Sequence, residues 1–153
     1  MKTKVALLVA LLLAGSLWTS STAVADAPDP AAVARRCVHA INQQAHTGAR
    51  HIGRICRHTL GEIREAIANE DREAARAAAE RGIMLACRVE HAAHNQIRMT
   101  VEHCLRVLNR LEADPELARI VVHAGQRGSR FVSAVKDRCL AAIADAVGHD
   151  GYT

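Results

Sequence analysis

The feature that most constrains the fold of this chain is an apolar pattern that recurs every three or four residues along most of its length. This spacing places the apolar side chains on one face of an α-helix, and no two-residue alternation typical of a strand occurs. The pattern breaks at residues 69–71 and 114–116, where Asp, and at the second break Pro, favour a new helix start. We therefore expect an all-α domain with helices over about 31–69, 72–113 and 115–147.

The predicted core faces follow from the same spacing. The second helix should bury Ala75, Ala78, Gly82, Leu85, Val89, Ala93, Ile97, Val101, Cys104, Leu108 and Leu111. The third should bury Leu117, Val121, Ala124, Gly128, Phe131, Val135, Cys139, Ala142 and Ala146.

Short breaks between long helices favour an antiparallel up-down-up bundle of three helices. An alternative is a first helix that is kinked or split near Thr47-Gly48 or at Gly53, which would give four or five shorter helices. In two antiparallel helices, the residue numbers of any two residues that lie side by side add up to the same value. This value is about 140 for the first and second predicted helices and about 227 for the second and third. This register predicts two thiol layers. Their members are Cys37 with Cys104, and Cys56 with Cys87 and Cys139.

The start of the chain predicts export. Lys2 and Lys4 precede an apolar run over residues 5–13, and Ala23-Val24-Ala25 provides the small residues of a cleavage site. The run is shorter than the roughly 18–20 residues that span a bilayer, so an uncleaved membrane anchor is the less favoured alternative. We expect a signal peptide over 1–25 and a periplasmic or extracellular protein that does not span the membrane. The remaining divisions are a linker over 26–31, a helical domain over 32–148 and a tail over 149–153.

Cleavage also changes what the charge implies about partners. Loss of Lys2 and Lys4 leaves eighteen Lys and Arg against sixteen Asp and Glu, so the formal net charge falls from +4 to +2. Phe131 and Tyr152 are then the only aromatic residues, which leaves no platform for stacking bases. The near balance of charge argues against nucleic acid as a partner.

In an exported protein, facing cysteines are most simply disulfides. We predict bridges between Cys37 and Cys104 and between Cys56 and Cys87, with Cys139 as a free thiol. One alternative is that all five cysteines are buried free thiols. Another is a copper or zinc site made by Cys56, Cys87 and Cys139. His91 and His94 lie near Cys87 in sequence and could assist such a site, although no metal cofactor is the favoured expectation.

The histidines and arginines suggest a surface role. His39, His46 and His123 project away from the apolar face, which favours solvated histidines over ligands. Residues 31–61 contain five Arg and four His but no acidic residue, so an acidic partner or an anionic envelope surface could bind there. The favoured expectation, however, is neutralisation within the bundle by Glu62, Glu80, Glu90 and Glu102.

The sequence provides little for catalysis. Ser129 and Ser133 are the only serines of the predicted mature chain, and neither lies in a nucleophile motif. We therefore expect no catalytic residues, and a structural role or one in protein or surface interaction. A periplasmic soft-metal protein is the alternative.

Four units share the spacing Cys-x3-Ile/Leu, and residues 113–119 read Ala-Asp-Pro-Glu-Leu-Ala-Arg. Together with the Arg- and His-rich helices, these units resemble exported helical proteins of planctomycete-type bacteria. The resemblance covers about residues 35–145. It implies a bacterial envelope protein and assigns no activity or site residue. The four units start at Cys37, Cys56, Cys104 and Cys139.

Overall fold

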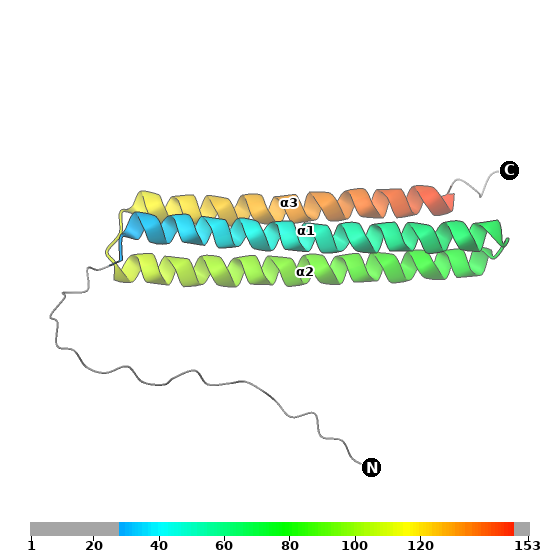
Figure 1. The fold of residues 1–153 in the computed structure, drawn as a ribbon, viewed down its shortest axis with the longest axis horizontal. Coiled ribbons are helices and arrows are strands. Elements are labelled where there is room, and N and C mark those ends of the chain that lie inside the picture. The colour runs from blue at the N-terminus through cyan, green and yellow to red at the C-terminus, as the bar shows by residue number, and fades with distance from the viewer. Residues whose placement is uncertain (1–27, 149–153) are drawn as a thin grey trace, which may run out of the picture.

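The computed structural model describes residues 28–148, which form three helices and no strand. The helices are α1 (Pro30–Ala68), α2 (Arg72–Arg110) and α3 (Pro115–Gly148). Each helix packs against both of the others, and consecutive helices run in opposite directions along one rod (Figure 1). The predicted all-α up-down-up bundle is therefore confirmed. The predicted signal peptide over 1–25 and the tail over 149–153 lie outside the described residues.

Aspartates start all three helices. The carboxylate of Asp29 accepts hydrogen bonds from the backbone N–H groups of residues 31 and 32, and that of Asp71 accepts one from residue 74. Asp114 accepts one from the N–H of Glu116 at 2.8 Å. These bonds satisfy backbone donors that have no partner inside a helix, so the local sequence sets where each helix begins.

Two glutamates end the first two helices. Glu70 and Glu112 have φ angles of 57° and 49°, in the left-handed region that turns the chain out of a helix. The backbone N–H of Glu112 donates to the carbonyl of Asn109 at 3.1 Å, which closes the turn. As a result α2 ends at Arg110, a few residues before the predicted end at 113.

The first helix is continuous across Thr47-Gly48 and Gly53, so the alternative with a split helix is not adopted. Gly48 allows close packing instead: a Cβ added there would lie 2.7 Å from the Cβ of Ala93 on α2. Gly82 on α2 lies equally tightly against Thr59 on α1. Both pairs fit the register predicted for the first antiparallel pair, so the relative heights of residues on α1 and α2 agree with the prediction.

The core is built from a few branched side chains separated by small residues. Leu85 and Phe131, which were predicted to be buried, are 47% and 38% exposed, and their neighbours Ala86 and Val132 are fully buried instead. Because α2 approaches α1 closely at Gly82, alanine fits at this level where leucine would not. Among the described residues the largest fully buried side chains are Ile41, Ile52, Ile63, Ile97, Leu108, Val121, Val132 and Ile143.

Candidate functional site

A line of basic side chains runs along the outer face of α1, and we call it the basic stripe. Its members recur at helical intervals, so they point in similar directions away from the core. All are exposed. At 1.5 Å per residue the stripe is about 32 Å long. The basic stripe consists of Arg36, His39, His46, Arg50, Arg54 and Arg57.

The arginines of the basic stripe have no acidic partners among the described residues. The nearby Arg35 pairs with Asp29 at 3.6 Å, and it is the only arginine between residues 31 and 61 in an ion pair there. The acidic residues expected to neutralise this stretch lie elsewhere: Glu62 contacts His58 and Arg81, Glu90 contacts Lys136, and Glu102 contacts Arg98. Glu80 forms no ion pair in the described part of the chain. The favoured expectation of neutralisation within the bundle is therefore wrong for the basic stripe.

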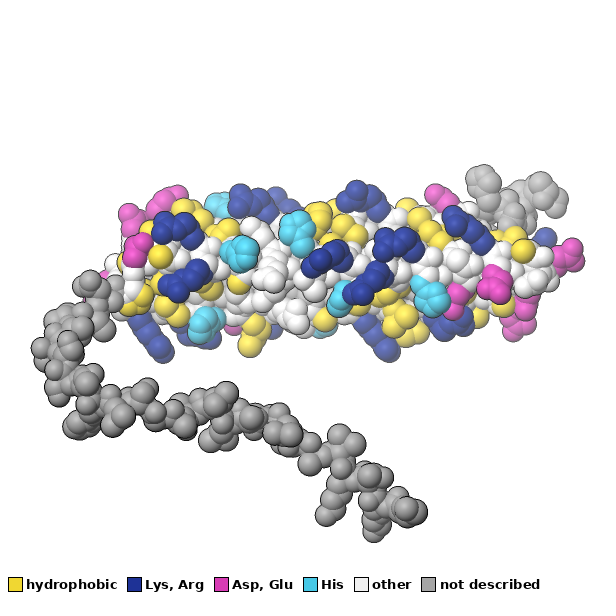
Figure 2. Space-filling view, viewed as in Figure 1, with side chains coloured by type: hydrophobic (Ala, Val, Ile, Leu, Met, Phe, Trp, Pro, Cys, Tyr) yellow, Lys and Arg dark blue, Asp and Glu magenta, His cyan; other side chains and the backbone are white. Residues whose placement is uncertain are grey.

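Charge is also segregated along the whole rod. We define a basic middle section by residues 35–58, 81–106 and 119–138, which lie at similar heights on the three helices. It contains fourteen Lys and Arg, three Asp and Glu, and all eight histidines of residues 28–148. The two ends of the described rod contain four Lys and Arg against eleven Asp and Glu. Figure 2 shows this division, with acidic side chains near both ends and basic ones between them.

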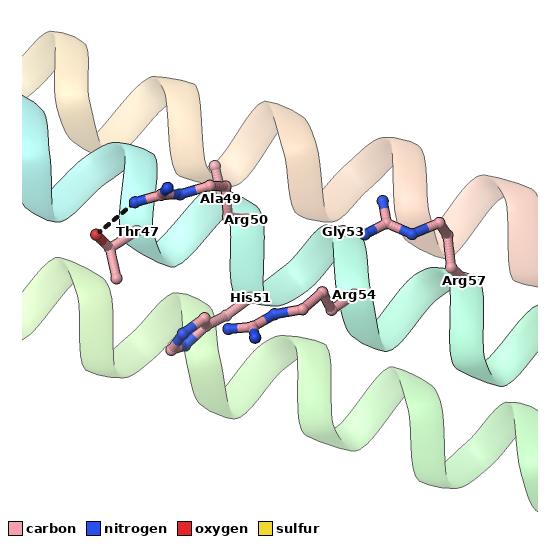
Figure 3. A pocket seen from close by; sticks show the side chains of 7 residues that line it. All are labelled: Thr47, Ala49, Arg50, His51, Gly53, Arg54 and Arg57. Carbon is pink, nitrogen blue, oxygen red and sulfur yellow. Dashed lines mark hydrogen bonds between the residues drawn. The ribbon is translucent and has the colours of Figure 1, made fainter.

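The C-terminal half of the basic stripe contains an open groove of about 640 Å³, and all of its lining residues belong to α1. Figure 3 shows His51 and Arg54 on the side toward α2, with Arg50 and Arg57 on the side toward α3. Arg50 Nη2 donates a long hydrogen bond to Thr47 Oγ1 at 3.5 Å. No carboxylate lines the groove. Its residues are Thr47, Ala49, Arg50, His51, Gly53, Arg54 and Arg57.

One of the two predicted disulfides is present. Cys37 on α1 and Cys104 on α2 are bonded, with Cα atoms 6.1 Å apart, and both are buried. The alternative of five free thiols is therefore wrong. The bridge joins residues 67 positions apart and links α1 to α2 near the end where the chain enters the bundle.

The predicted Cys56–Cys87 bridge is not formed, and Cys56, Cys87 and Cys139 are all free thiols. The height of Cys87 agrees with the prediction, but its direction does not. Ala86 is the fully buried residue at this level, and its neighbour on a helix points about 100° away, which leaves Cys87 exposed. Cys56 instead donates an S–H···O contact to the carbonyl of Cys139 at 3.9 Å.

The residues of the alternative soft-metal site do not form one metal-binding group. Within residues 28–148 no group of three or more His, Cys, Asp or Glu side chains is placed to hold a metal ion. His91 is exposed and contacts Asn95 at 3.0 Å, whereas His94 turns toward α3. The hydrogen bonds of His91 and His94 in the described part of the chain therefore involve no cysteine.

A polar network between α2 and α3 was missed by the sequence reasoning. Ser133 Oγ donates to Glu90 Oε1 at 2.7 Å, and Lys136 Nζ lies 3.4 Å from Glu90 Oε2. Hydrogen bonding to Asp137 and the nearby Glu90 carboxylate raise the pKa of Lys136. The paired spacing of Glu90 with His94 and of Ser129 with Ser133, four residues in each case, could have suggested a network between these helices, although the observed pairs lie about one helical turn from the predicted register.

This network does not have the arrangement of a serine hydrolase. His94 Nε2 lies 3.2 Å from the carbonyl oxygen of Ser129 and 3.3 Å from Ser133 Oγ, and both of these oxygens can accept a hydrogen bond from it. The hydroxyl proton of Ser133 is directed at the Glu90 carboxylate, not at His94. In a hydrolase triad the histidine takes that proton. The network joins two helices.

The free thiols provide a test of the packing. At pH 8 iodoacetamide should modify Cys87 first, because this side chain is exposed, while Cys139 should resist. Burial, together with the nearby Cys56, raises the pKa of Cys139 to about 12, so only about one part in ten thousand is reactive thiolate. Mass spectrometry of peptides over time gives the order. A Cys87→Ala variant should lose the fast phase, and rapid modification of Cys139 in the folded protein would contradict this packing.

Fold and surface together define a three-helix rod with an exposed basic face. None of the described helices has a stretch that is both long and apolar enough to cross a membrane. Comparison with known proteins gives no match to a protein-family model, a curated protein or a solved structure.

Proposed function

We propose that this protein is an exported, non-catalytic helical bundle that lies on an anionic membrane surface through the basic stripe of α1. The observation that carries the proposal is the set of exposed arginines without ion pairs, on a face about 32 Å long. Uncompensated positive charge on one straight face favours contact with a negatively charged plane. Export itself rests on the predicted signal peptide.

The expected strength of such docking follows from charge alone. Each Lys or Arg near an anionic bilayer contributes about 1 kcal/mol, so Arg36, Arg50, Arg54 and Arg57 together contribute about 4 kcal/mol. The histidines of the stripe add to this when they are protonated. Attachment of this kind is reversible and weakens as salt screens the charges.

The test compares two triple variants that remove equal charge. Arg50, Arg54 and Arg57 are changed to Gln in one, and Arg72, Arg76 and Arg110, at the acidic ends, are changed to Gln in the other. Binding is measured by co-sedimentation with vesicles of neutral lipid and of neutral lipid mixed with phosphatidylglycerol. The stripe variant should bind the anionic vesicles roughly 100-fold more weakly than the unmodified protein.

The control variant should bind within about twofold of the unmodified protein, because its arginines lie outside the basic middle section. Equal loss in both variants would show that only net charge matters. Equal binding to neutral and anionic vesicles would likewise contradict the proposal.

A further inference from the structure

Gly53, like Gly61, is a glycine inside α1 without a packing reason, and of the two only Gly53 lies in the groove. A glycine at an interior helix position costs about 1 kcal/mol relative to alanine. Gly48, Gly82 and Gly125 each lie so close to a side chain of another helix that an added Cβ would collide. At Gly53 the added Cβ would meet only Arg57 Nη1 at 3.7 Å, an ordinary contact with the end of a flexible side chain.

What Gly53 does provide is the floor of the groove in the basic stripe, which we call the Gly53 hollow. Arg50 and Arg54 are four residues apart, and Arg54 and Arg57 are three apart, so neighbouring charges repel each other along the helix. No carboxylate lines the hollow. A bound anion would relieve this repulsion, and the missing side chain leaves room for it to approach the helix backbone.

We infer that the Gly53 hollow binds a phosphate monoester group, held mainly by Arg57, whose Nη1 lies beside Gly53, with Arg54 on the side toward α2 (Figure 3). Guanidinium groups match a phosphate with two parallel hydrogen bonds, and a compact dianion offers more charge per oxygen than a phosphodiester. Arg50, His51 and the Thr47 hydroxyl lie on the rim (Figure 3). The inference rests on the proposed function in one respect, because it names the lipid headgroup that the basic stripe would select.

The experiment uses Gly53→Leu, with Gly61→Leu as the matched control. Both glycines lie in α1 with room for a side chain, and nothing lies within 4 Å of a Cβ at Gly61. Both changes raise helix propensity, so loss of binding by Gly53→Leu cannot be ascribed to an unfolded helix. The first probe is inorganic phosphate, titrated by calorimetry against a chloride background. Gly53→Leu should weaken phosphate binding roughly tenfold, whereas Gly61→Leu should not change it.

The second probe separates a lipid headgroup from free phosphate. Vesicles containing phosphatidic acid, a monoester, are compared with phosphatidylglycerol vesicles of equal surface charge. The unmodified protein should prefer the monoester vesicles, and Gly53→Leu should bind both alike. If the protein binds inorganic phosphate but binds both kinds of vesicle equally well, the Gly53 hollow is a phosphate site and its ligand is free phosphate.

The outcomes distinguish the two proposals. If Gly53→Leu and Gly61→Leu bind phosphate equally well, the hollow is not a phosphate site, even if anionic vesicles are still bound through the stripe. If the unmodified protein binds phosphate, Gly53→Leu does not, and neither binds vesicles, the phosphate site is supported and the proposed membrane docking is wrong.

Discussion

A double variant in which Cys37 and Cys104 are changed to alanine is expected to unfold with a free energy about 4 kcal/mol smaller than that of the unmodified protein. The bridge closes a loop between residues 67 positions apart, and a long loop loses much conformational entropy when it is closed in the unfolded chain. Alanine is used at both positions because each side chain is buried and a hydroxyl would lack a partner there. Thermal unfolding followed by circular dichroism should show Tm lower by about 15 °C.

The control for this prediction is Cys87→Ala, which changes an exposed thiol and should leave Tm within about 2 °C. Treatment of the unmodified protein with a strong reductant should lower Tm as the double variant does. An unchanged Tm in the double variant would mean that the bridge contributes nothing to stability.

The second large effect is expected at Gly82, where an alanine should cost about 2 kcal/mol of folding free energy. The added Cβ would lie 2.9 Å from the Cβ of Thr59, as well as against both of its branches. Thr59 is 3% exposed, and its Cβ is fixed by the backbone of α1, so no side-chain rotation removes the collision. The two helices must therefore move apart, which also loosens the packing on either side. Urea unfolding monitored by circular dichroism gives the free energy.

Gly61→Ala is the matched control, because a Cβ there meets nothing within 4 Å. It should raise the free energy of unfolding by about 1 kcal/mol through helix propensity alone. Combining Thr59→Ala with Gly82→Ala should recover part of the loss by removing the two branches. If Gly82→Ala were as stable as Gly61→Ala, the close approach of α1 and α2 at this level would be incorrect.

The fold was accessible from the sequence because height along a rod and the start of each helix depend on local features. Asp71 and Asp114 mark the starts of α2 and α3 as N-terminal caps. The position of the first turn sets the register that places Cys37 opposite Cys104. The rotation of each helix about its own axis, which decides the residues that face the core, was harder to predict from the sequence. Leu85 and Ala86 both satisfy an apolar spacing, and only the close approach of α1 selects the smaller side chain for the core. The same rotation turns Cys87 outward and away from Cys56.

The basic stripe could be predicted only in part from the sequence. The absence of acidic residues between 31 and 61 indicated a polarised helix, but whether Glu62 or Glu90 neutralised it depended on contacts between helices. Gly53 could be interpreted only as a possible break in the helix. Its role as the floor of a groove depends on the arginine side chains around it, and their positions follow from which face of α1 is buried.

The segregated charge of the rod has a consequence for how densely the protein can cover a surface. Two copies that lie side by side and in register bring one basic middle section against another, so they repel each other. At physiological ionic strength this repulsion acts over about 8 Å, so it matters for molecules that nearly touch. A copy displaced lengthwise by about half of the roughly 58 Å rod places an acidic end against a basic middle section instead. Crowded molecules are therefore expected to form a staggered layer rather than an aligned raft.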